Sequence, residues 1–194
     1  LWKKTYQKFL EEKDRLIEFL EKVRNEACPY IIFTGAGTSA FIGEALAGAF
    51  LKKWGVSSRA VSTTDIVTHP ENYFIRSRPT LLVSFARSGD SPESLYATEL
   101  ADKYCDKLYK LNITCNEQGQ LAKNSGDENT YLFLLPEETN DRSLAMTSSF
   151  SSMLLTGLLI LYIHENEQLS RIVERVCNLG SHILNEYLSG LKEI

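Results

Sequence analysis

The chain has 194 residues, of which 43% are hydrophobic and 24% are charged. This composition is typical of a globular protein and excludes a disordered or fibrous chain, and the length suits one domain or a tight pair. With a net charge of −4, the chain lacks the excess of positive charge that is typical of proteins that bind nucleic acid or an anionic membrane. The longest apolar stretch, 150–163, is interrupted by hydroxyl residues and falls short of the roughly 18 residues of a membrane span. We therefore expect a soluble protein.

The four cysteines lie far apart, with no CxxC pair and no Cys/His cluster: Cys28, Cys105, Cys115 and Cys177. This spacing predicts neither a zinc site nor a disulfide framework, and indicates reduced core thiols in a cytosolic protein. The N-terminus lacks the apolar region and cleavage site of a signal peptide, which also favours a cytoplasmic location. Because the chain has no initiator Met and ends on LSGLKEI, we expect it to be a piece of something longer.

In the first third of the chain, the hydrophobic period changes from helical to strand-like. Apolar residues recur every three or four positions from Trp2 to Val23, which predicts an amphipathic helix that ends near Ala27. The apolar run 30–33 predicts a strand buried on both faces. A Gly-rich turn, a helix over 41–54 and a β-like segment over 59–62 follow.

Strand and helix continue to alternate further along the chain. The patterns predict strands over 80–85, 108–115 and 131–135, and helices over 91–105, 118–123 and 144–163. A polar connection over 164–167 leads to a final amphipathic helix that starts at Leu169. This alternation predicts an α/β fold, a three-layer α-β-α sandwich around a five-stranded, mainly parallel sheet.

The chain divides into three predicted parts: an amphipathic helix over 1–27, one domain over 28–163, and an amphipathic helix over 164–194. Each terminal helix carries an apolar stripe that the five-stranded core need not fully cover. We expect both stripes to pack against a second domain, either in a longer chain or in another copy. Helices that complete this domain's own layers are the alternative.

The first candidate ligand loop, 34–40, contains Gly37, Thr38 and Ser39. In an open parallel sheet, ligands bind beyond the carboxyl ends of the strands. The glycines let the backbone approach a ligand, and the hydroxyls and free N–H groups at a helix start suit an anion. No acidic residue ends the next strand and no P-loop Lys is present, so the loop matches neither the dinucleotide-binding motif nor the P-loop. A capped turn without a ligand is the alternative.

The second loop, 86–94, contains Arg87, Ser88, Gly89 and Ser91. Ser91 is expected to cap the next helix ahead of Pro92. The other three residues exceed what a cap requires, and together they form a nest suited to a phosphate or similar oxyanion.

The third loop, 138–150, places several hydroxyls, among them those of Thr147 and Ser148, at the head of the most buried helix. Buried hydroxyls are costly unless they are satisfied. Three hydroxyl-rich helix starts at one edge of the sheet favour a phosphorylated ligand.

These turns resemble those of the sugar isomerase (SIS) domain family. The string from Glu138 to Arg142, the helix start from Ala145 to Ser149, and the Thr-Thr-Asp at 63–65 are similar to AgaS-type members, known as tagatose-6-phosphate ketose/aldose isomerases or galactosamine-6-phosphate deaminase/isomerases. The resemblance spans roughly residues 30 to 160. It implies a flavodoxin-like domain that needs no metal or other cofactor and holds the phosphate of an aldose or ketose phosphate.

The resemblance also implies roles for individual residues, carried over by position. Ser39, Ser88 and Ser91 would bind the phosphate, Thr38 would support them, and Thr147 or Ser148 would line the sugar side. Ala86 stands where the family turn has a first Ser, which removes one hydroxyl. Arg87 either supplies the missing interaction or points to solvent.

The AgaS-type members carry two SIS domains in tandem, and this chain carries one, so a second SIS domain is implied as a partner. Moving a proton between two sugar carbons requires a carboxylate or an imidazole, but no residue here has a position that demands this role. Glu44, one turn into the helix after the first loop, either is solvated or faces the ligand, and Glu93 is expected to be a partner of its helix dipole. His69 is expected on an exposed loop, and His164 and His182 near helix ends or surfaces. Asp65 either caps the following segment or orients a substrate hydroxyl, and the catalytic base stays unassigned.

The predicted function is that of a cytoplasmic sugar-phosphate isomerase or deaminase that acts on a hexose or hexosamine 6-phosphate. This chain would supply the phosphate-binding domain, and alone it would bind the ligand without turning it over. The alternative is a non-catalytic SIS module that senses a sugar phosphate and regulates a partner. Neither nucleic acid nor a membrane is expected as a partner.

Overall fold

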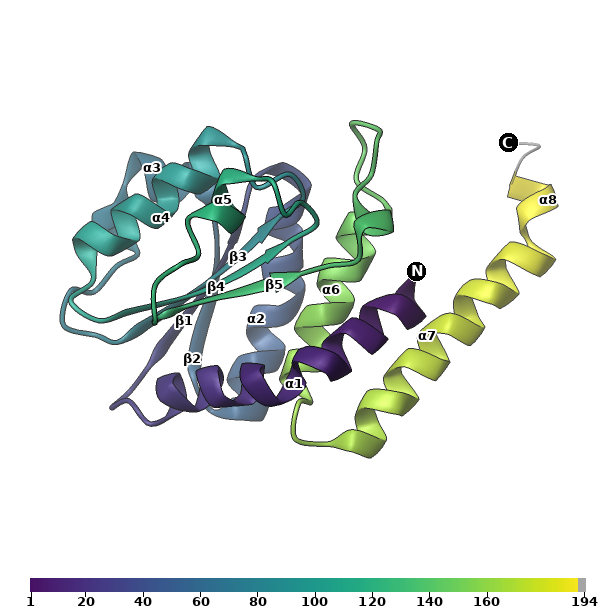
Figure 1. Cartoon of the computed structure of the whole chain (residues 1–194), viewed down its shortest axis with the longest axis horizontal. Coiled ribbons are helices and arrows are strands. Elements are labelled where there is room, and N and C mark those ends of the chain that lie inside the picture. Colours follow the sequence, from purple (N-terminus) through teal and green to yellow (C-terminus); the bar gives the residue numbers. More distant parts are fainter. Residues whose placement is uncertain (192–194) are drawn as a thin grey trace.

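The computed structural model describes residues 1–191 and contains a five-stranded, all-parallel sheet with helices on both faces (Figure 1). The strands are β1 (Tyr30–Gly35), β2 (Ser57–Ser62), β3 (Thr80–Ala86), β4 (Leu108–Thr114) and β5 (Thr130–Leu134). Their order across the sheet is β2-β1-β3-β4-β5. The predicted three-layer α/β fold is confirmed.

The helices divide between the two faces of the sheet. On one face lie α1 (Trp2–Arg24), α2 (Ala40–Trp54) and α6 (Ser148–Leu161); on the other lie α3 (Thr63–Thr68), α4 (Pro92–Tyr104) and α5 (Gln120–Lys123). The chain ends with α7 (Asn166–Glu186) and α8 (Leu188–Leu191), and three short 3₁₀ turns cover Gly37–Ser39, Pro70–Asn72 and Glu137–Thr139. No described helix is long and apolar enough to cross a membrane.

The continuous apolar runs of β1 and β3 follow from this arrangement. Phe33 and Val83 belong to the core beneath α1, α2 and α6, whereas Ile32 and Leu82 belong to the core beneath α3 and α4. Successive strand residues point to opposite faces, so a strand covered on both sides must be apolar at every position.

Helix α1 completes the domain's own core. Its buried side chains include Phe9, Leu16 and Phe19, each at most 5% exposed. The ring centroid of Phe9 lies 6.2 Å from that of Phe133 of β5, in the same core. The expectation that the α1 stripe packs against a second domain is therefore wrong, because β5 and α6 already cover it.

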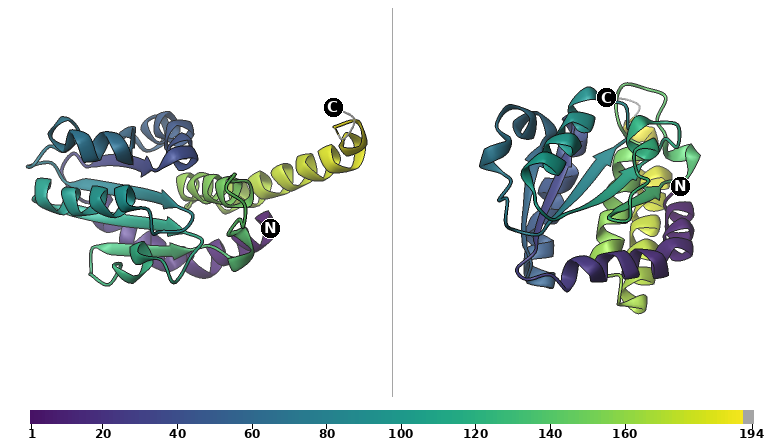
Figure 2. Two further views of the ribbon diagram at one scale, coloured as in Figure 1. Left: turned by 90° about the horizontal axis from the view of Figure 1, so that it is seen from above. Right: turned by 60° about the vertical axis from the view of Figure 1, so that its left-hand side comes forward.

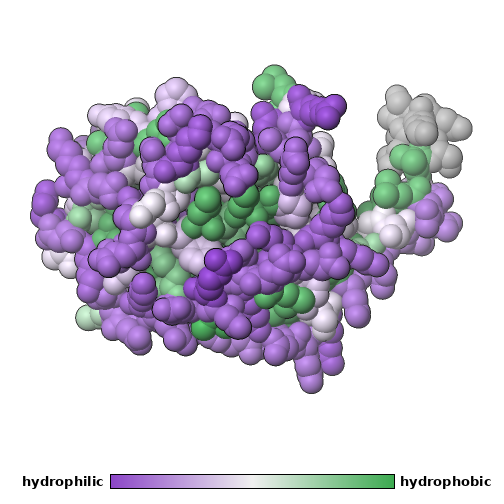
Figure 3. Space-filling view, in the orientation of Figure 1, coloured by the Kyte–Doolittle hydropathy of each residue, from purple (hydrophilic) through white to green (hydrophobic). Residues whose placement is uncertain are grey.

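Helix α7 is different, because its buried residues lie in its first turns, and its later part contacts only the start of α1 in the domain, where Trp2 lies beside Gly180. Leu169 and Val173 are buried, but Leu179, Ile183 and Leu184 are 50–60% exposed. The helix extends away from the sheet (Figure 2) and carries hydrophobic surface on its projecting part (Figure 3). Packing of this stripe against a second domain stays a prediction.

All four cysteines are free, but not all are core thiols. Cys105 and Cys115 are buried, and burial raises the pKa of the Cys115 thiol to about 11. Cys177 is half-buried and Cys28 is exposed. The prediction is wrong for Cys28 because α1 has already ended and the residue sits in the turn before β1, in the left-handed region with a φ of 53°.

Candidate functional site

The candidate site lies where β1 and β3 end, side by side, at the carboxyl edge of the sheet. Gly35 of β1 is in register with Phe85 of β3. From β1 the chain crosses to β2 on one side, while β3 to β5 continue on the other. Such a switch point leaves a crevice between the two following loops, where open α/β sheets bind ligands. Both predicted turns follow strands that end here.

The GTS turn (Gly37–Ser39) connects β1 to α2 through a tight backbone path. Gly37 has a φ of 55°, which favours glycine. A side chain at Gly35 would lie 2.7 Å from atoms of Ser39, so the turn closes tightly over the strand end. Ser39 is 3% exposed, and its hydroxyl donates to the Met146 sulfur at 3.6 Å. Thr38 is exposed.

The SGxS turn (88–91) connects β3 to α4, with Gly89 at a φ of 68°. The Ser88 hydroxyl accepts from the Asp90 backbone N–H at 3.3 Å. Ser91 occupies the N-cap position before Pro92, but its hydroxyl donates to the Ser94 hydroxyl at 2.6 Å rather than accepting from the helix backbone. The predicted position of the cap is confirmed, and the predicted cap hydrogen bond is not formed.

Arg87 does not point to solvent alone. Its guanidinium donates to the backbone carbonyl of Ser143, in the loop between β5 and α6. A guanidinium that donates to a neutral carbonyl retains further donors in its planar fork, so the group can also bind an oxyanion.

The third loop is organised by Asp141, which the sequence interpretation did not single out. Its carboxylate accepts hydrogen bonds from the backbone N–H groups of Thr147, Ser148 and Ser149, at 2.8–3.0 Å. It also accepts from the hydroxyls of Thr147 and Ser149, at 2.9 and 2.6 Å. Desolvation alone would raise the pKa of Asp141, but these hydrogen bonds outweigh it and hold the pKa well below its ordinary range.

This network changes two expectations. The predicted helix start at Leu144 is wrong: α6 begins at Ser148, because Asp141 satisfies the first free N–H groups only there. The α6 N-terminus already holds an anion, the Asp141 carboxylate, so it is not a third free anion site. Leu144 instead lies 94% exposed in the projecting loop, whose tip shows a hydrophobic patch beside hydrophilic atoms in Figure 3.

The loop between β5 and α6 nevertheless reaches the GTS turn and Arg87, the residue just before the SGxS turn. Met146 contacts the hydroxyl of Ser39, and Ser143 accepts from Arg87. Thr147 and Ser148 are tied to Asp141 by hydrogen bonds, and they also border a pocket of about 640 Å³ between α6, α7 and the start of α1. Their predicted contact with a sugar stays a prediction.

The loop after β4 also supports the SGxS turn, which sequence reasoning missed. The Asn116 side-chain amide donates to the Ser88 carbonyl at 2.9 Å. A side chain at Gly119 would lie 2.3 Å from that same carbonyl oxygen, so only glycine fits there without displacing the turn. An Asn and a Gly after a strand are common in any loop, and nothing in their spacing points to Ser88.

None of the acid–base candidates takes part in the hydrogen bonds around Ser39, Ser88 and Ser91 within the described residues. His69, His164 and His182 are exposed, and Glu93 is in the first turn of α4. The catalytic base stays unassigned.

Glu44 and Asp65 border a small pocket of about 120 Å³, with Arg59, beside the end of β2. The cap of α3 is Ser62, whose hydroxyl accepts from the Asp65 N–H at 3.3 Å, so the capping role expected for Asp65 is wrong. Over residues 1–191, no three His, Cys, Asp or Glu side chains are grouped to hold a metal ion.

Comparison with known proteins places this geometry in a family. The SIS domain model matches residues 27–163. The D-galactosamine-6-phosphate deaminase AgaS of Shewanella sp. (strain ANA-3) is 41% identical over 196 residues, covering 99% of this chain and 49% of that protein. The chain spans about half the length of the curated relatives it matches.

Two crystal structures superpose closely on the chain. A Clostridium novyi NT protein has a TM-score of 0.94 at 40% identity, over 99% of this chain and 49% of that one. The tagatose-6-phosphate ketose/aldose isomerase from Escherichia coli has a TM-score of 0.87 at 37% identity, over 94% and 50%. The chain has a five-stranded parallel sheet, a turn with a positive-φ glycine after each of the two strands at its switch point, and a family match over most of its length. It belongs to the SIS domain family.

Proposed function

We propose that this chain is the phosphate-binding SIS unit of a sugar-phosphate isomerase or deaminase. Its substrate would be a hexose or hexosamine 6-phosphate of the tagatose-6-phosphate or galactosamine-6-phosphate type, as the names of the relatives indicate. The observation that carries the proposal is that the strands leading into the GTS and SGxS turns, β1 and β3, are neighbours and end in register at the switch point of the sheet.

The two turns supply the chemistry that a phosphate monoester needs. Ser39, Ser88 and Ser91 offer hydroxyl donors, and backbone N–H groups at the starts of α2 and α4 add to them. In the free protein the Ser39 hydroxyl donates to the thioether of Met146, the Ser91 hydroxyl donates to the Ser94 hydroxyl, and both of these acceptors are weak or neutral. A dianionic phosphate is a stronger acceptor than either, so its binding exchanges weaker hydrogen bonds for charge-assisted ones.

The test replaces Ser88 and Ser91 together by Ala and measures the affinity for galactosamine 6-phosphate by calorimetric titration. Each hydrogen bond to a charged group contributes about 1.5–3 kcal/mol, so the double variant should bind roughly 2–4 kcal/mol more weakly. Ser170→Ala is the matched control, because that hydroxyl donates to a backbone carbonyl within α7, far along the chain from the turns. Unchanged affinity in the double variant would place the phosphate site elsewhere.

Binding and turnover are expected to separate in this chain. The phosphate donors lie within 37–91, whereas the acid–base candidates take no part in their hydrogen bonds. A positioned acid or base contributes about 10²- to 10⁴-fold in rate, so an ammonia assay on the same sample should stay near background. Robust turnover would contradict this and would point to Glu44 or His69, which the variants Glu44→Ala and His69→Ala would distinguish. The same assay on a chain as long as the relatives separates an enzyme from a sugar-phosphate sensor.

A second SIS unit is the proposed partner, either further along a longer chain or in another copy. The support is that the relatives are about twice as long and that the α7 stripe is exposed at Leu179, Ile183 and Leu184. Isolated, this chain should therefore self-associate at tens of micromolar in analytical ultracentrifugation, and Ile183→Glu should shift it toward monomer. A monodisperse wild-type monomer would contradict the proposal.

We further propose a cytoplasmic location for the protein, because free thiols persist in that compartment.

A further inference from the structure

A row of three buried polar side chains crosses the centre of the sheet, directly below the candidate site. Thr34 of β1 is in register with Ser84 of β3, which is in register with Asn112 of β4. Each residue is at most 3% exposed. Among the described residues, no protein group forms a hydrogen bond with Thr34 Oγ1, Ser84 Oγ or Asn112 Oδ1.

All three side chains lie on the face covered by α3, α4 and α5. Their strand neighbours Phe33, Val83 and Leu111 belong to the opposite core, and successive side chains alternate between faces. The buried residues of α4, on the same face, include two with small side chains, Ser94 and Ala97. The row therefore places three polar groups on a face of the sheet that is buried under helices.

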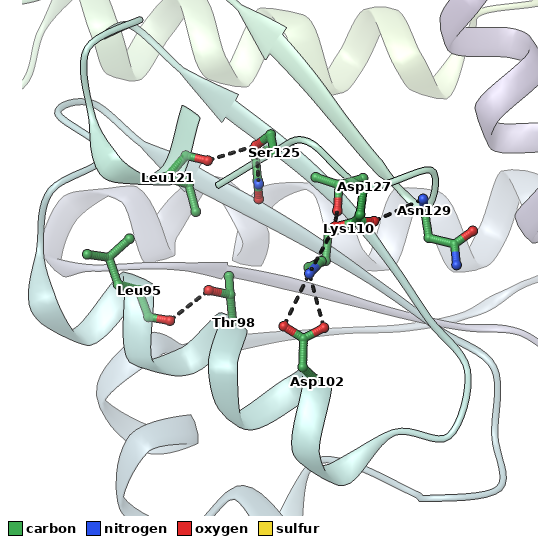
Figure 4. Close-up of polar contacts among 10 residues, drawn as sticks. Leu95, Thr98, Asp102, Lys110, Leu121, Ser125, Asp127 and Asn129 are labelled. Carbon is green, nitrogen blue, oxygen red and sulfur yellow. Dashed lines mark hydrogen bonds and ion pairs between the residues drawn. The ribbon is translucent and has the colours of Figure 1, made fainter. Parts of the chain in front are cut away.

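The orientation of the Asn112 amide is set from its other end. Asn112 Nδ2 donates to the Ser125 hydroxyl at 2.9 Å. That hydroxyl donates in turn to the Leu121 carbonyl at 2.7 Å, as Figure 4 shows. Because the Ser125 proton is committed to Leu121, its oxygen must accept from a donor, which assigns the nitrogen of Asn112 to that side. Oδ1 then lies on the opposite side of the amide.

The spacing of the strands explains why the three side chains do not hydrogen-bond to one another. Neighbouring strands are about 4.8 Å apart, whereas a hydroxyl–oxygen hydrogen bond spans about 2.7–2.8 Å. One water molecule between two such groups spans about 5.5 Å at most, which matches the strand spacing. Buried polar groups without a partner are costly, and ordered water that bonds two to four polar groups is the usual remedy.

We propose that Thr34, Ser84 and Asn112 hold ordered water between β1, β3 and β4, and that this water fixes the strand ends from which the two phosphate turns leave. Thr34 is followed at once by Gly35 and the GTS turn, and Ser84 lies two residues before Ala86 and the SGxS turn. Thr34 and Ser84 are then positioning residues for the anion site. Their effect on ligand affinity rests on the function proposed above, whereas the water site itself does not.

Thr34→Val tests the water site, because it keeps the shape of the side chain and removes the hydroxyl. A hydroxyl that bonds water stabilises the fold, so the variant should lower the Tm by about 2–6 °C. An orphan hydroxyl would instead be costly, and its removal would leave the Tm unchanged or raise it, which would overturn the proposal. Thr5→Val is the matched control: its buried hydroxyl also has no described partner but stands outside the row, and its removal should not lower the Tm.

Two further measurements separate positioning from general stability. Thr34→Val should bind galactosamine 6-phosphate about fivefold more weakly, and Thr34→Ser, which restores the hydroxyl, should regain the affinity. Equal affinity of the Val variant and the wild type would overturn the positioning role. A crystal structure that resolves ordered water should show a molecule bonded to Thr34 Oγ1 and Ser84 Oγ, and empty density there would overturn the water site. If wild-type protein binds no sugar phosphate but shows this water, the proposed function fails while the water site stands.

Discussion

The carboxylate of Asp141 holds the start of α6, and its removal gives a sharp test of the structure. Asp141→Ala leaves the backbone N–H groups of Thr147, Ser148 and Ser149 without their acceptor, together with two hydroxyls. Thr147 is exposed and Ser148 half-buried, so their groups recover hydrogen bonds to water. Ser149 is fully buried, and its N–H and hydroxyl lose their partner outright.

The magnitude follows from these two contributions. Loss of a helix cap costs about 1 kcal/mol, and leaving a buried donor unsatisfied costs about 1–3 kcal/mol. We expect Asp141→Ala to lower the free energy of unfolding by about 3 kcal/mol, or the Tm by about 6–12 °C for a chain of this size. Asp141→Asn keeps one acceptor oxygen and should lose about half as much. Asp14→Ala, on the exposed face of α1, is the control and should change stability by less than about 0.5 kcal/mol.

The pH dependence of stability gives a second test of the role of Asp141. The hydrogen bonds hold the folded-state pKa of Asp141 below its ordinary value of 3.8. The carboxylate's contribution is therefore complete above that value and is lost as the pH falls through the folded-state pKa. Urea unfolding should show a constant gap between wild type and Asp141→Asn from pH 7 to pH 5, and the gap should shrink below pH 3.8. A gap below about 0.5 kcal/mol at pH 7, or one that widens in acid, would refute the reasoning.

Three further predictions concern other parts of the chain. Gly119→Ala should displace the SGxS turn and weaken phosphate binding about tenfold in calorimetric titration, because its Cβ would lie 2.3 Å from a carbonyl oxygen of that turn; Gly48→Ala, in open space on α2, should not. Tyr131→Phe should lower the free energy of unfolding in urea by about 1.5 kcal/mol, since the phenol donates to the Glu12 carboxylate at 2.8 Å, and an unchanged midpoint would contradict this. Ellman's reagent should react first with Cys28, the exposed thiol, so that Cys28→Ser removes the fastest phase; persistence of that phase would place the accessible thiol elsewhere.

The candidate site was only partly predictable from the sequence. A Gly-rich turn after a buried strand has a local signature, so the GTS and SGxS turns could be found and placed at one sheet edge. The contacts that hold them have no such signature. Asp141 reaches N–H groups six to eight residues ahead, and Asn116 reaches Ser88 across 28 residues. Partners this far apart depend on where separate strands end.

Local chemistry thus determined the strands, the main helices and the two phosphate turns, because hydrophobic period and glycine placement act over a few residues. Tertiary structure decided what those elements meet. The stripes of α1 and α7 look alike in the sequence, yet β5 and α6 cover the first, while the distal half of the second extends past the sheet. The register of β1, β3 and β4 likewise brought Thr34, Ser84 and Asn112 into one row. Neither outcome is encoded in a local pattern, because both depend on strand order and register, which long-range packing sets.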